Sequence, residues 1–199
     1  MTIKSKNIKA ISHPVTDLDR ADRQGHRGGV LWLTGLPGAG KSTLAFALER
    51  RLFDAGHQVY VMDGDNLRHG LNSDLGFSHQ DRTENIRRVG EVAALYAGAG
   101  MIAITAFISP YRAGRDGARG ASSVGFHEVH LSASVEVCES RDPKGHYKKA
   151  RQGKISDFTG VSAPYETPEN PELVIDTGTL SVEECLKILE DYVDANFTQ

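Results

Sequence analysis

Short apolar runs alternate with longer amphipathic stretches along most of the chain. The apolar, β-prone runs occupy residues 29–34, 58–62, 101–107, 128–131 and 172–175. Helical spacing of apolar residues predicts helices over about 42–55, 78–97, 112–121, 134–141 and 181–195. Strands that alternate with helices favour a mostly parallel central sheet with helices on both faces, so we predict an α/β three-layer sandwich.

Two stretches depart from this pattern. Residues 1–27 are polar and of mixed charge, and we expect an N-terminal extension or arm there, before a domain that spans 28–199. Residues 92–111 carry no charged side chain and are long enough to cross a bilayer. Gly98, Gly100 and Pro110 interrupt this run, and its two halves are typical of a helix end and a buried strand. We therefore expect no membrane partner.

The most specific motif lies where the first strand becomes a helix. The segment GLPGAGKS at residues 35–42 fits G-x-x-x-x-G-K-[ST] at every fixed position, so we expect a P-loop NTPase-type fold. Backbone N–H groups of such a loop surround phosphates, and the positive end of the following helix favours anions. We expect Lys41 to reach the outer phosphates and Ser42 to ligate Mg²⁺. The predicted ATP ligands in the loop are Gly35, Leu36, Pro37, Gly38, Ala39, Gly40, Lys41, Ser42 and Thr43.

Two carboxylates, Asp63 and Asp65, directly follow the strand predicted over 58–62. Ligands of open parallel sheets collect beyond the carboxyl ends of the strands, which places both beside the phosphate loop. We expect Asp63 to bind Mg²⁺ with Ser42, and Asp65 to accept a proton from an attacking hydroxyl. The alternative is that Asp65 or Asn66 merely caps a short following helix.

Basic side chains then cluster around one asparagine: Arg68, Arg82, Arg87 and Arg88 around Asn85. Arg82 and Asn85 are three residues apart, so they share a helix face. Ser78 and Asp81 resemble a capping box, which would place both near the positive end of the helix. The cluster suits a multiply charged anion, and the alternative is a solvated charged face.

Two later segments complete the predicted crevice. Ser109 follows the strand predicted over 101–107, and we expect its hydroxyl to face the crevice and to bind or transiently receive phosphate. The alternative is that Ser109 caps the helix beginning at Arg112. Residues 142–160 are basic and punctuated by glycine, as is typical of a lid that closes over anionic ligands and excludes water.

Composition and net charge indicate which class of ligand and which cellular compartment to expect. The formal net charge of −3 over 199 residues gives no whole-molecule attraction to nucleic acid, so we expect small anions as ligands. Cys138 and Cys185 form no C-x-x-C pair, which fits a reducing cytosol, and no secretory signal is visible, so we expect a cytoplasmic protein. The eight histidines show no metal-ligand spacing.

Several sequence segments outside the phosphate loop are far more specific for one function than the loop itself. With them, the chain resembles the adenylyl-sulfate kinase family of the stand-alone bacterial type over nearly its whole length. These segments are residues 12–16, 26–28, 63–71, 75–78, 84–92, 107–110, 141–145, 147–151 and 158–160. The resemblance implies transfer of the ATP γ-phosphate to the 3′-hydroxyl of adenosine 5′-phosphosulfate (APS). The products would be 3′-phosphoadenosine 5′-phosphosulfate (PAPS) and ADP, in sulfate assimilation, and family members commonly form homodimers.

The resemblance also implies roles for individual residues. Phe77 and Phe158 would sandwich the APS adenine, and Arg141 and Thr177 would border the ATP adenine. Ser109 matches the position of a phosphoserine intermediate in the family, although direct in-line transfer suits the same arrangement equally well. The residues that would line the APS site are Asp65, Arg68, Phe77, Arg82, Asn85, Ile108, Ser109, Lys144 and Phe158.

Two other functions remain open from the residues alone. Another small-molecule or nucleotide kinase on the same scaffold would differ in its acceptor site, between Arg68 and Asn85 and near Phe158. A regulatory nucleotide-binding module would need the phosphate loop but no acceptor pocket, and the paired aspartates favour catalysis over this alternative.

Overall fold

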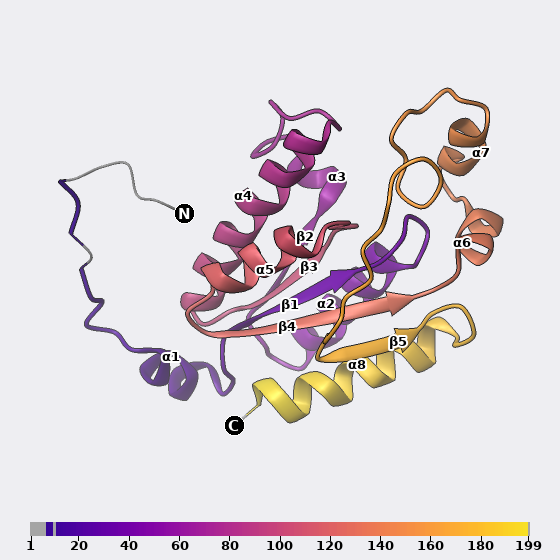
Figure 1. Ribbon diagram of the computed structural model, residues 1–199. Helices are drawn as coiled ribbons and strands as arrows, with labels where there is room; N and C mark the ends of the chain where they lie inside the picture. Colours follow the sequence, from indigo (N-terminus) through magenta and orange to yellow (C-terminus); the bar gives the residue numbers. More distant parts are fainter. Residues whose placement is uncertain (1–6, 10, 199) are drawn as a thin grey trace.

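A computed structural model describes residues 7–9 and 11–198, and it contains a five-stranded sheet in the order β2-β3-β1-β4-β5 (Figure 1). Each neighbouring pair of these strands is parallel, which confirms the predicted architecture. The carboxyl ends of the strands therefore lie at one edge. The strands are β1 (Gly29–Thr34), β2 (Val59–Asp63), β3 (Ile102–Ala106), β4 (Gly125–Ser132) and β5 (Leu173–Asp176).

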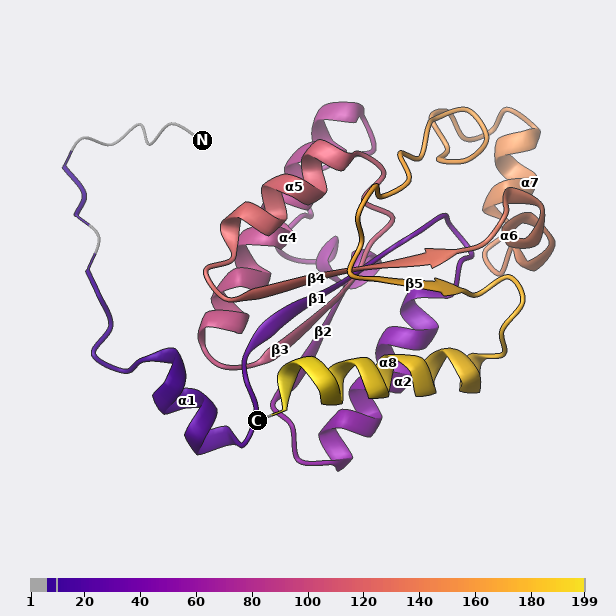
Figure 2. The same ribbon diagram turned by 60° about the horizontal axis from the view of Figure 1, so that its bottom comes forward.

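Helices cover both faces of the sheet. Figures 1 and 2 show α2 (Lys41–Asp54) and α8 (Val182–Phe197) on one face, and α4 (His79–Gly98) and α5 (Arg112–Ala121) on the other. A shorter helix, α6 (Val135–Arg141), follows β4 at the carboxyl edge. All five were predicted within a few residues, and three of them begin at a serine cap.

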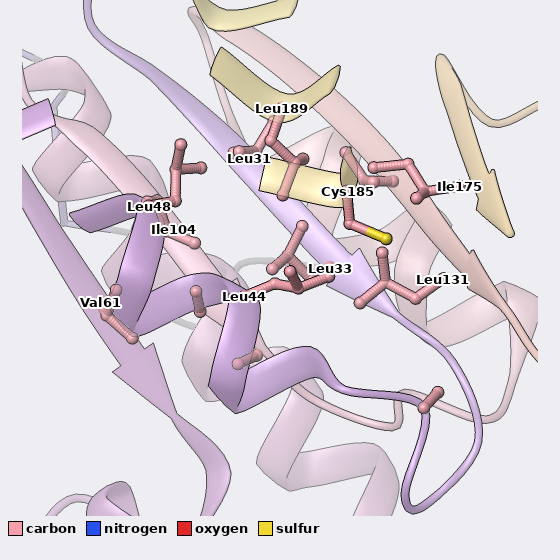
Figure 3. Close-up of a cluster of buried hydrophobic side chains, with 14 of the residues drawn as sticks. Leu31, Leu33, Leu44, Leu48, Val61, Ile104, Leu131, Ile175, Cys185 and Leu189 are labelled. Carbon is pink, nitrogen blue, oxygen red and sulfur yellow. The ribbon is translucent and has the colours of Figure 1, made fainter. Parts of the chain in front are cut away.

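The sheet separates two hydrophobic cores because successive strand residues point to opposite faces. In β1, Leu31 and Leu33 pack toward α2 and α8, and Val30 and Trp32 pack toward α4 and α5. Figure 3 shows the first core, where leucines of β1, α2 and α8 interdigitate. These strands are buried on both faces, which explains why they read as continuous apolar runs rather than as alternating ones.

Close packing of α4 on α5 depends on one glycine. A Cβ at Gly90 would lie 2.8 Å from both the Cα and the Cβ of Ala118, closer than real Cβ contacts. Gly90 therefore sets the distance between the two helices. The uncharged run 92–111 divides into the end of α4 and the buried strand β3, as predicted, and no helix in the described part of the chain is long and apolar enough to cross a membrane.

Three helices were not predicted: α1 (Asp17–Gln24), α3 (Gly64–Leu67) and α7 (His146–Arg151). The first lies in the predicted N-terminal extension, of which residues 1–6 and 10 are outside the described residues. Thr16 and Asp19 form a capping box at its start, a signal that is visible in the sequence. Arg20 donates to the carbonyl of Ala99 at 3.5 Å and so ties α1 to the end of α4.

Candidate active site

The phosphate loop joins β1 to α2 at the carboxyl edge of the sheet. Gly38 and Gly40 have φ values of +80° and +92°, a region that favours glycine, and a Cβ at Gly38 would lie 2.9 Å from the carbonyl oxygen of Cys138. The loop thus needs glycine both for its turn and for its contact with α6. Its geometry agrees with the motif.

Lys41 is the buried cation of this loop. Its Nζ donates to the carbonyl oxygens of Gly35 and Leu36, at 2.9 and 2.7 Å. Burial lowers the pKa of Lys41 to about 8, an effect that the Asp63 carboxylate partly offsets. The ammonium group is therefore still largely protonated at neutral pH, and two carbonyls of the phosphate loop hold it.

The Asp63 carboxylate accepts two hydrogen bonds, one from the phosphate loop and one from the helix that follows β2. One carboxylate oxygen accepts from Ser42 Oγ at 2.6 Å, and the other accepts from the backbone N–H of Asp65 at 3.0 Å. The second bond caps α3, so the capping residue is Asp63, and the alternative that Asp65 or Asn66 caps this helix is wrong. Ser42 and Asp63 thus bring two oxygen ligands together beside the loop.

Asp65 instead extends into the opening of the site. Its carboxylate pairs with Lys144, and both side chains are more than half exposed. Lys144 lies just before α7, in the predicted lid. This ion pair therefore links the end of β2 to the lid, and it brings together two residues that the sequence predicts in the same site.

Arg141 and Thr177 flank the other side of the phosphate loop. Arg141 donates to the carbonyl of Thr177 at 2.6 Å, and to that of Gly38 at 3.5 Å. The Thr177 hydroxyl donates to the carbonyl of Ala39 at 3.0 Å. The end of α6 and the turn after β5 therefore meet at the loop, where the ATP adenine is predicted.

The predicted acceptor side is built around Arg68 and Arg82. The Arg68 guanidinium lies 4.2 Å from the centre of the Phe77 ring, and it donates to the carbonyls of Leu75 and Gly76. Phe77 itself is 67% exposed. The arginine therefore covers one face of an exposed aromatic ring at the rim of the site.

Arg82 connects this rim to the lid. Its guanidinium donates to the carbonyl of Phe77, to the Thr159 hydroxyl and to the carbonyl of Asp157. Phe158, between these two lid residues, is buried and packs edge-to-face on Tyr147, with ring centres 5.0 Å apart. Arg82 thus joins the backbone at Phe77 to the residues on either side of Phe158, whose ring belongs to the hydrophobic core. No contact between the rings of Phe77 and Phe158 occurs in the described part of the chain.

The remaining arginines of the cluster have structural partners. Glu84 accepts from both Arg87 and Arg88, and these bonds lower the pKa of Glu84 to about 2. Arg88 also pairs with Asp74 at 2.6 Å. Arg88 therefore fastens the segment before α4 onto that helix, whereas Arg87 pairs within α4. Asn85, which lies between Arg82 and Arg87 in the sequence, is buried.

Ser109 is oriented differently from the prediction. The residue is only 2% exposed, and its Oγ accepts from Trp32 Nε1 at 3.1 Å and donates to Thr34 Oγ1 at 2.9 Å. The expectation that its hydroxyl faces the crevice is therefore wrong for this structure. A φ of +40° turns the chain at Ser109, and its hydroxyl lies on the side of the sheet that holds Trp32 and Phe107.

The alternative interpretation of Ser109 is also wrong. The cap residue of α5 is Tyr111, and the first backbone N–H of the helix, that of Arg112, donates to the Glu166 carboxylate at 2.7 Å. Neighbouring Ile108 is partly buried, and its carbonyl accepts from the Thr34 hydroxyl at 2.8 Å. Thr34 was not singled out in the sequence, because a threonine inside an apolar strand gives no signal of such a contact.

Sequence reasoning missed two further residues, one in the lid and one just after it. Tyr147 is buried on α7, and its hydroxyl donates to the carbonyl of Pro37 in the phosphate loop at 2.9 Å. Tyr165, which follows the lid, has its hydroxyl 3.0 Å from Thr34 Oγ1, and burial raises its pKa to about 12. Both ends of the lid therefore contact the carboxyl edge of β1 and the loop that follows it. Tyr147 lies in a basic segment and Tyr165 in a polar one, where an aromatic residue is easily taken for a surface residue.

Similarity to known proteins agrees with this geometry. A sequence model of the family described as "Adenylylsulphate kinase" matches residues 27–176. The adenylyl-sulfate kinase of Staphylococcus carnosus is 53% identical over 193 residues, 96% of this chain and 97% of that protein.

Two solved structures show the same fold. The Mycobacterium tuberculosis APS kinase CysC in complex with AMPPNP and APS is 45% identical, with a TM-score of 0.81 over 84% of this chain and 98% of that one. The hexameric APS kinase from Thiobacillus denitrificans is 35% identical, with a TM-score of 0.66 over 86% of this chain and 30% of that one. The family match covers most of the chain, and the relatives share its phosphate-loop kinase architecture. The chain belongs to the adenylyl-sulfate kinase family.

Proposed function

We propose that the chain transfers the γ-phosphate of ATP to the 3′-hydroxyl of APS, giving PAPS and ADP. One observation carries this proposal. The phosphate loop and the Asp65–Lys144 ion pair meet at the same edge of the sheet, joined through Asp63. A triphosphate and an anionic acceptor therefore find their ligands side by side. The M. tuberculosis relative in complex with AMPPNP and APS supports these two ligands.

On the donor side, the loop residues 35–43 bind the ATP phosphates through their backbone N–H groups. Lys41 leaves the two loop carbonyls and turns to the outer phosphates, where a positive charge stabilises the charge that develops during transfer. Arg141 and Thr177 border the adenine. Their mutual hydrogen bond and their bonds to the loop hold that border in place.

The site fits Mg²⁺ as the cofactor. Ser42 Oγ and the Asp63 carboxylate lie 2.6 Å apart, and both are the oxygen ligands that Mg²⁺ prefers. No group of three or more His, Cys, Asp or Glu side chains suited to a metal occurs in the described residues, which agrees with an ion that takes most of its ligands from phosphates and water. Bound Mg²⁺ would neutralise charge on the β- and γ-phosphates.

On the acceptor side, Asp65 accepts the proton of the attacking 3′-hydroxyl, and Lys144 holds the Asp65 carboxylate in place. Arg68, Arg82 and Asn85 face the anionic phosphosulfate. Phe77 and Phe158 lie at the adenine, because an aromatic face binds a base with few polar contacts. Ile108 and Ser109 form the floor of this side of the site.

Transfer is direct and in line rather than through a phosphoserine. The Ser109 hydroxyl is buried, accepts from Trp32 and donates its hydrogen to Thr34. A role as phosphate acceptor would require both bonds to break and the side chain to turn outward. Asp65, by contrast, is exposed beside the loop, where a proton acceptor is needed.

We also propose that the chain forms a homodimer in a reducing cytoplasm. Its family resemblance supports the oligomer, and the two buried, unpaired cysteines support the compartment. Light scattering of the purified chain measures the molar mass against the 21.6 kDa of one copy. A mass of one copy at micromolar concentration would contradict the dimer.

The test of the activity is coupled ADP release with and without APS. We expect ATP turnover to require APS, and Lys41→Ala to lower kcat by about 100-fold or more while the protein stays folded. Lys187→Ala is the matched control, since Lys187 is an exposed lysine on α8, away from the phosphate loop in sequence, and its ion pair is with Asp191 of the same helix. Preference for AMP or gluconate as acceptor would indicate another small-molecule kinase, and binding of ATP without any turnover would indicate a regulatory module.

A further inference from the structure

Asn72 is a fully buried polar residue in the segment between α3 and α4. Its side-chain Nδ2 donates to Oδ1 of Asn85 at 2.9 Å, and its exposed fraction is 0%. Its own Oδ1 is buried and has no hydrogen-bond partner among the described residues. A buried oxygen without a partner is destabilising, and an apolar residue would avoid it. The amide of Asn72 therefore calls for an explanation other than stability.

The hydrogen bond fixes which end of the Asn85 amide is available. A side-chain amide accepts at its oxygen and donates twice at its nitrogen. Because the Asn85 oxygen accepts from Asn72, the Asn85 nitrogen is directed away from Asn72. In the described part of the chain this nitrogen has no protein acceptor, and it is not among the buried atoms that lack a partner. It is thus free to donate to a ligand.

We propose that Asn72 is a positioning residue that holds the Asn85 amide with both hydrogens toward the acceptor site. This inference rests on the proposed function, in which APS binds beside Asn85. The phosphosulfate group offers only acceptor oxygens, so it is attracted by N–H donors and repelled by a carbonyl oxygen. An Asn85 amide rotated by half a turn would present its oxygen instead. Asn72 prevents that rotation.

A purely structural role for this contact is less well supported, because other bonds already fasten the segment. Arg88 donates to the carbonyl of Leu71 at 3.0 Å and pairs with Asp74. Arg68 donates to the carbonyls of Leu75 and Gly76. The segment on both sides of Asn72 is therefore anchored without the amide pair. What the amide pair adds is the direction of the Asn85 group.

The decisive variant is Asn72→Asp, which keeps the shape but replaces the donor with an acceptor. The ionised carboxylate accepts from Asn85 Nδ2, and the Asn85 oxygen then faces the acceptor site. We expect the KM for APS to rise roughly ten- to hundredfold, and the KM for ATP to stay within about twofold. The charge control is Asn170→Asp, an exposed position, where we expect neither KM to change.

The pH dependence separates orientation from a merely structural effect. Burial raises the pKa of a carboxyl group, so the aspartate at position 72 takes up a proton at mildly acidic pH. The protonated group donates to Asn85 Oδ1 and restores the original amide direction. The ratio of wild-type to Asn72→Asp kcat/KM for APS should therefore shrink from about pH 8 to about pH 5.5. A ratio that is independent of pH, or equal rises in both KM values, would overturn the inference.

A second measurement needs no variant that might misfold. In NMR spectra of the wild-type chain labelled with ¹⁵N at asparagine, the side-chain N–H₂ signals of Asn85 should shift when APS is added and stay in place with ATP alone. Asn85 signals that do not respond to saturating APS would refute the proposal. Wild-type turnover of APS in the same preparation keeps the proposed function separate: its absence would contradict that function, whereas normal turnover with unresponsive Asn85 contradicts only the role of Asn72.

Discussion

Removal of the Ser109 hydroxyl separates a buried structural role from a covalent one. In Ser109→Ala, Trp32 Nε1 loses its acceptor and Thr34 Oγ1 loses one donor, while the backbone at φ +40° keeps a residue with a Cβ. Direct in-line transfer needs none of these groups as a phosphate acceptor. We therefore expect the variant to be less stable than the wild type and to retain substantial turnover.

The expected loss of stability follows from the burial of these partners. Trp32 is fully buried and Ser109 is 2% exposed, so water does not replace the lost bond. A buried donor left without a partner costs about 1–3 kcal/mol. For a chain of this size, about 2 kcal/mol corresponds to a fall in Tm of about 4–8 °C. At 25 °C most of the variant therefore stays folded, and its activity can be measured.

Urea unfolding gives the free energy of unfolding, and coupled ADP release with APS gives kcat. The matched control is Thr105→Val, because Thr105 is also buried on β3 but its hydroxyl has no partner among the described residues. We expect that variant to be as stable as the wild type or more stable. A folded Ser109→Ala protein with no measurable turnover would restore the phosphoserine mechanism, and an unchanged free energy of unfolding would contradict the buried network.

Two further predictions concern the lid and acid stability. Tyr147→Phe removes the hydrogen bond to the carbonyl of Pro37, so we expect a higher KM for ATP and faster proteolysis within 142–160, with little change in the circular dichroism spectrum. Buried His26 accepts from the N–H of Gln58, and burial lowers its pKa below 6.5. At mildly acidic pH the unfolded chain therefore binds more protons than the folded one, so the free energy of unfolding should fall as pH drops below about 6.5. Urea titrations at about pH 7.5 and 5.5 measure this fall, and His26→Gln should make it smaller.

The strands and long helices could be predicted because local sequence and tertiary packing agree in them. β1 and β3 are buried on both faces, so an unbroken apolar run is both a strand signal and a packing requirement. Ser78, Ser134 and Ser181 cap three helices with their side chains, and each is visible from its position before an apolar period. The phosphate loop could also be predicted, because Gly38 and Gly40 adopt positive φ values that favour glycine.

The direction of individual side chains could not be predicted, since it depends on contacts distant in sequence. Ser109 turns inward because Trp32 and Thr34, more than seventy positions earlier, supply a donor and an acceptor there. The sequence places Asp63 beside Ser42, but it does not show that the Asp63 carboxylate also caps α3. Local sequence placed these residues at the correct edge of the sheet, but tertiary contacts decide which atoms face the ligands.

Contacts between residues distant in sequence also connect the lid to the part of the site formed by Ile108 and Ser109. Arg115 is almost fully buried and pairs with Glu128 of β4 at 2.5 Å, and it donates to the carbonyls of Ser109 and Glu166, each at 2.7 Å. Glu166 follows Tyr165, just after the lid. Arg115 therefore connects the segment after the lid to Ser109, which follows β3. The start of the lid is bonded to the phosphate loop through Tyr147. Because both ends are fastened to the edge that holds the ligands, the placement of the lid depends on the sheet rather than on the lid's own exposed, basic sequence.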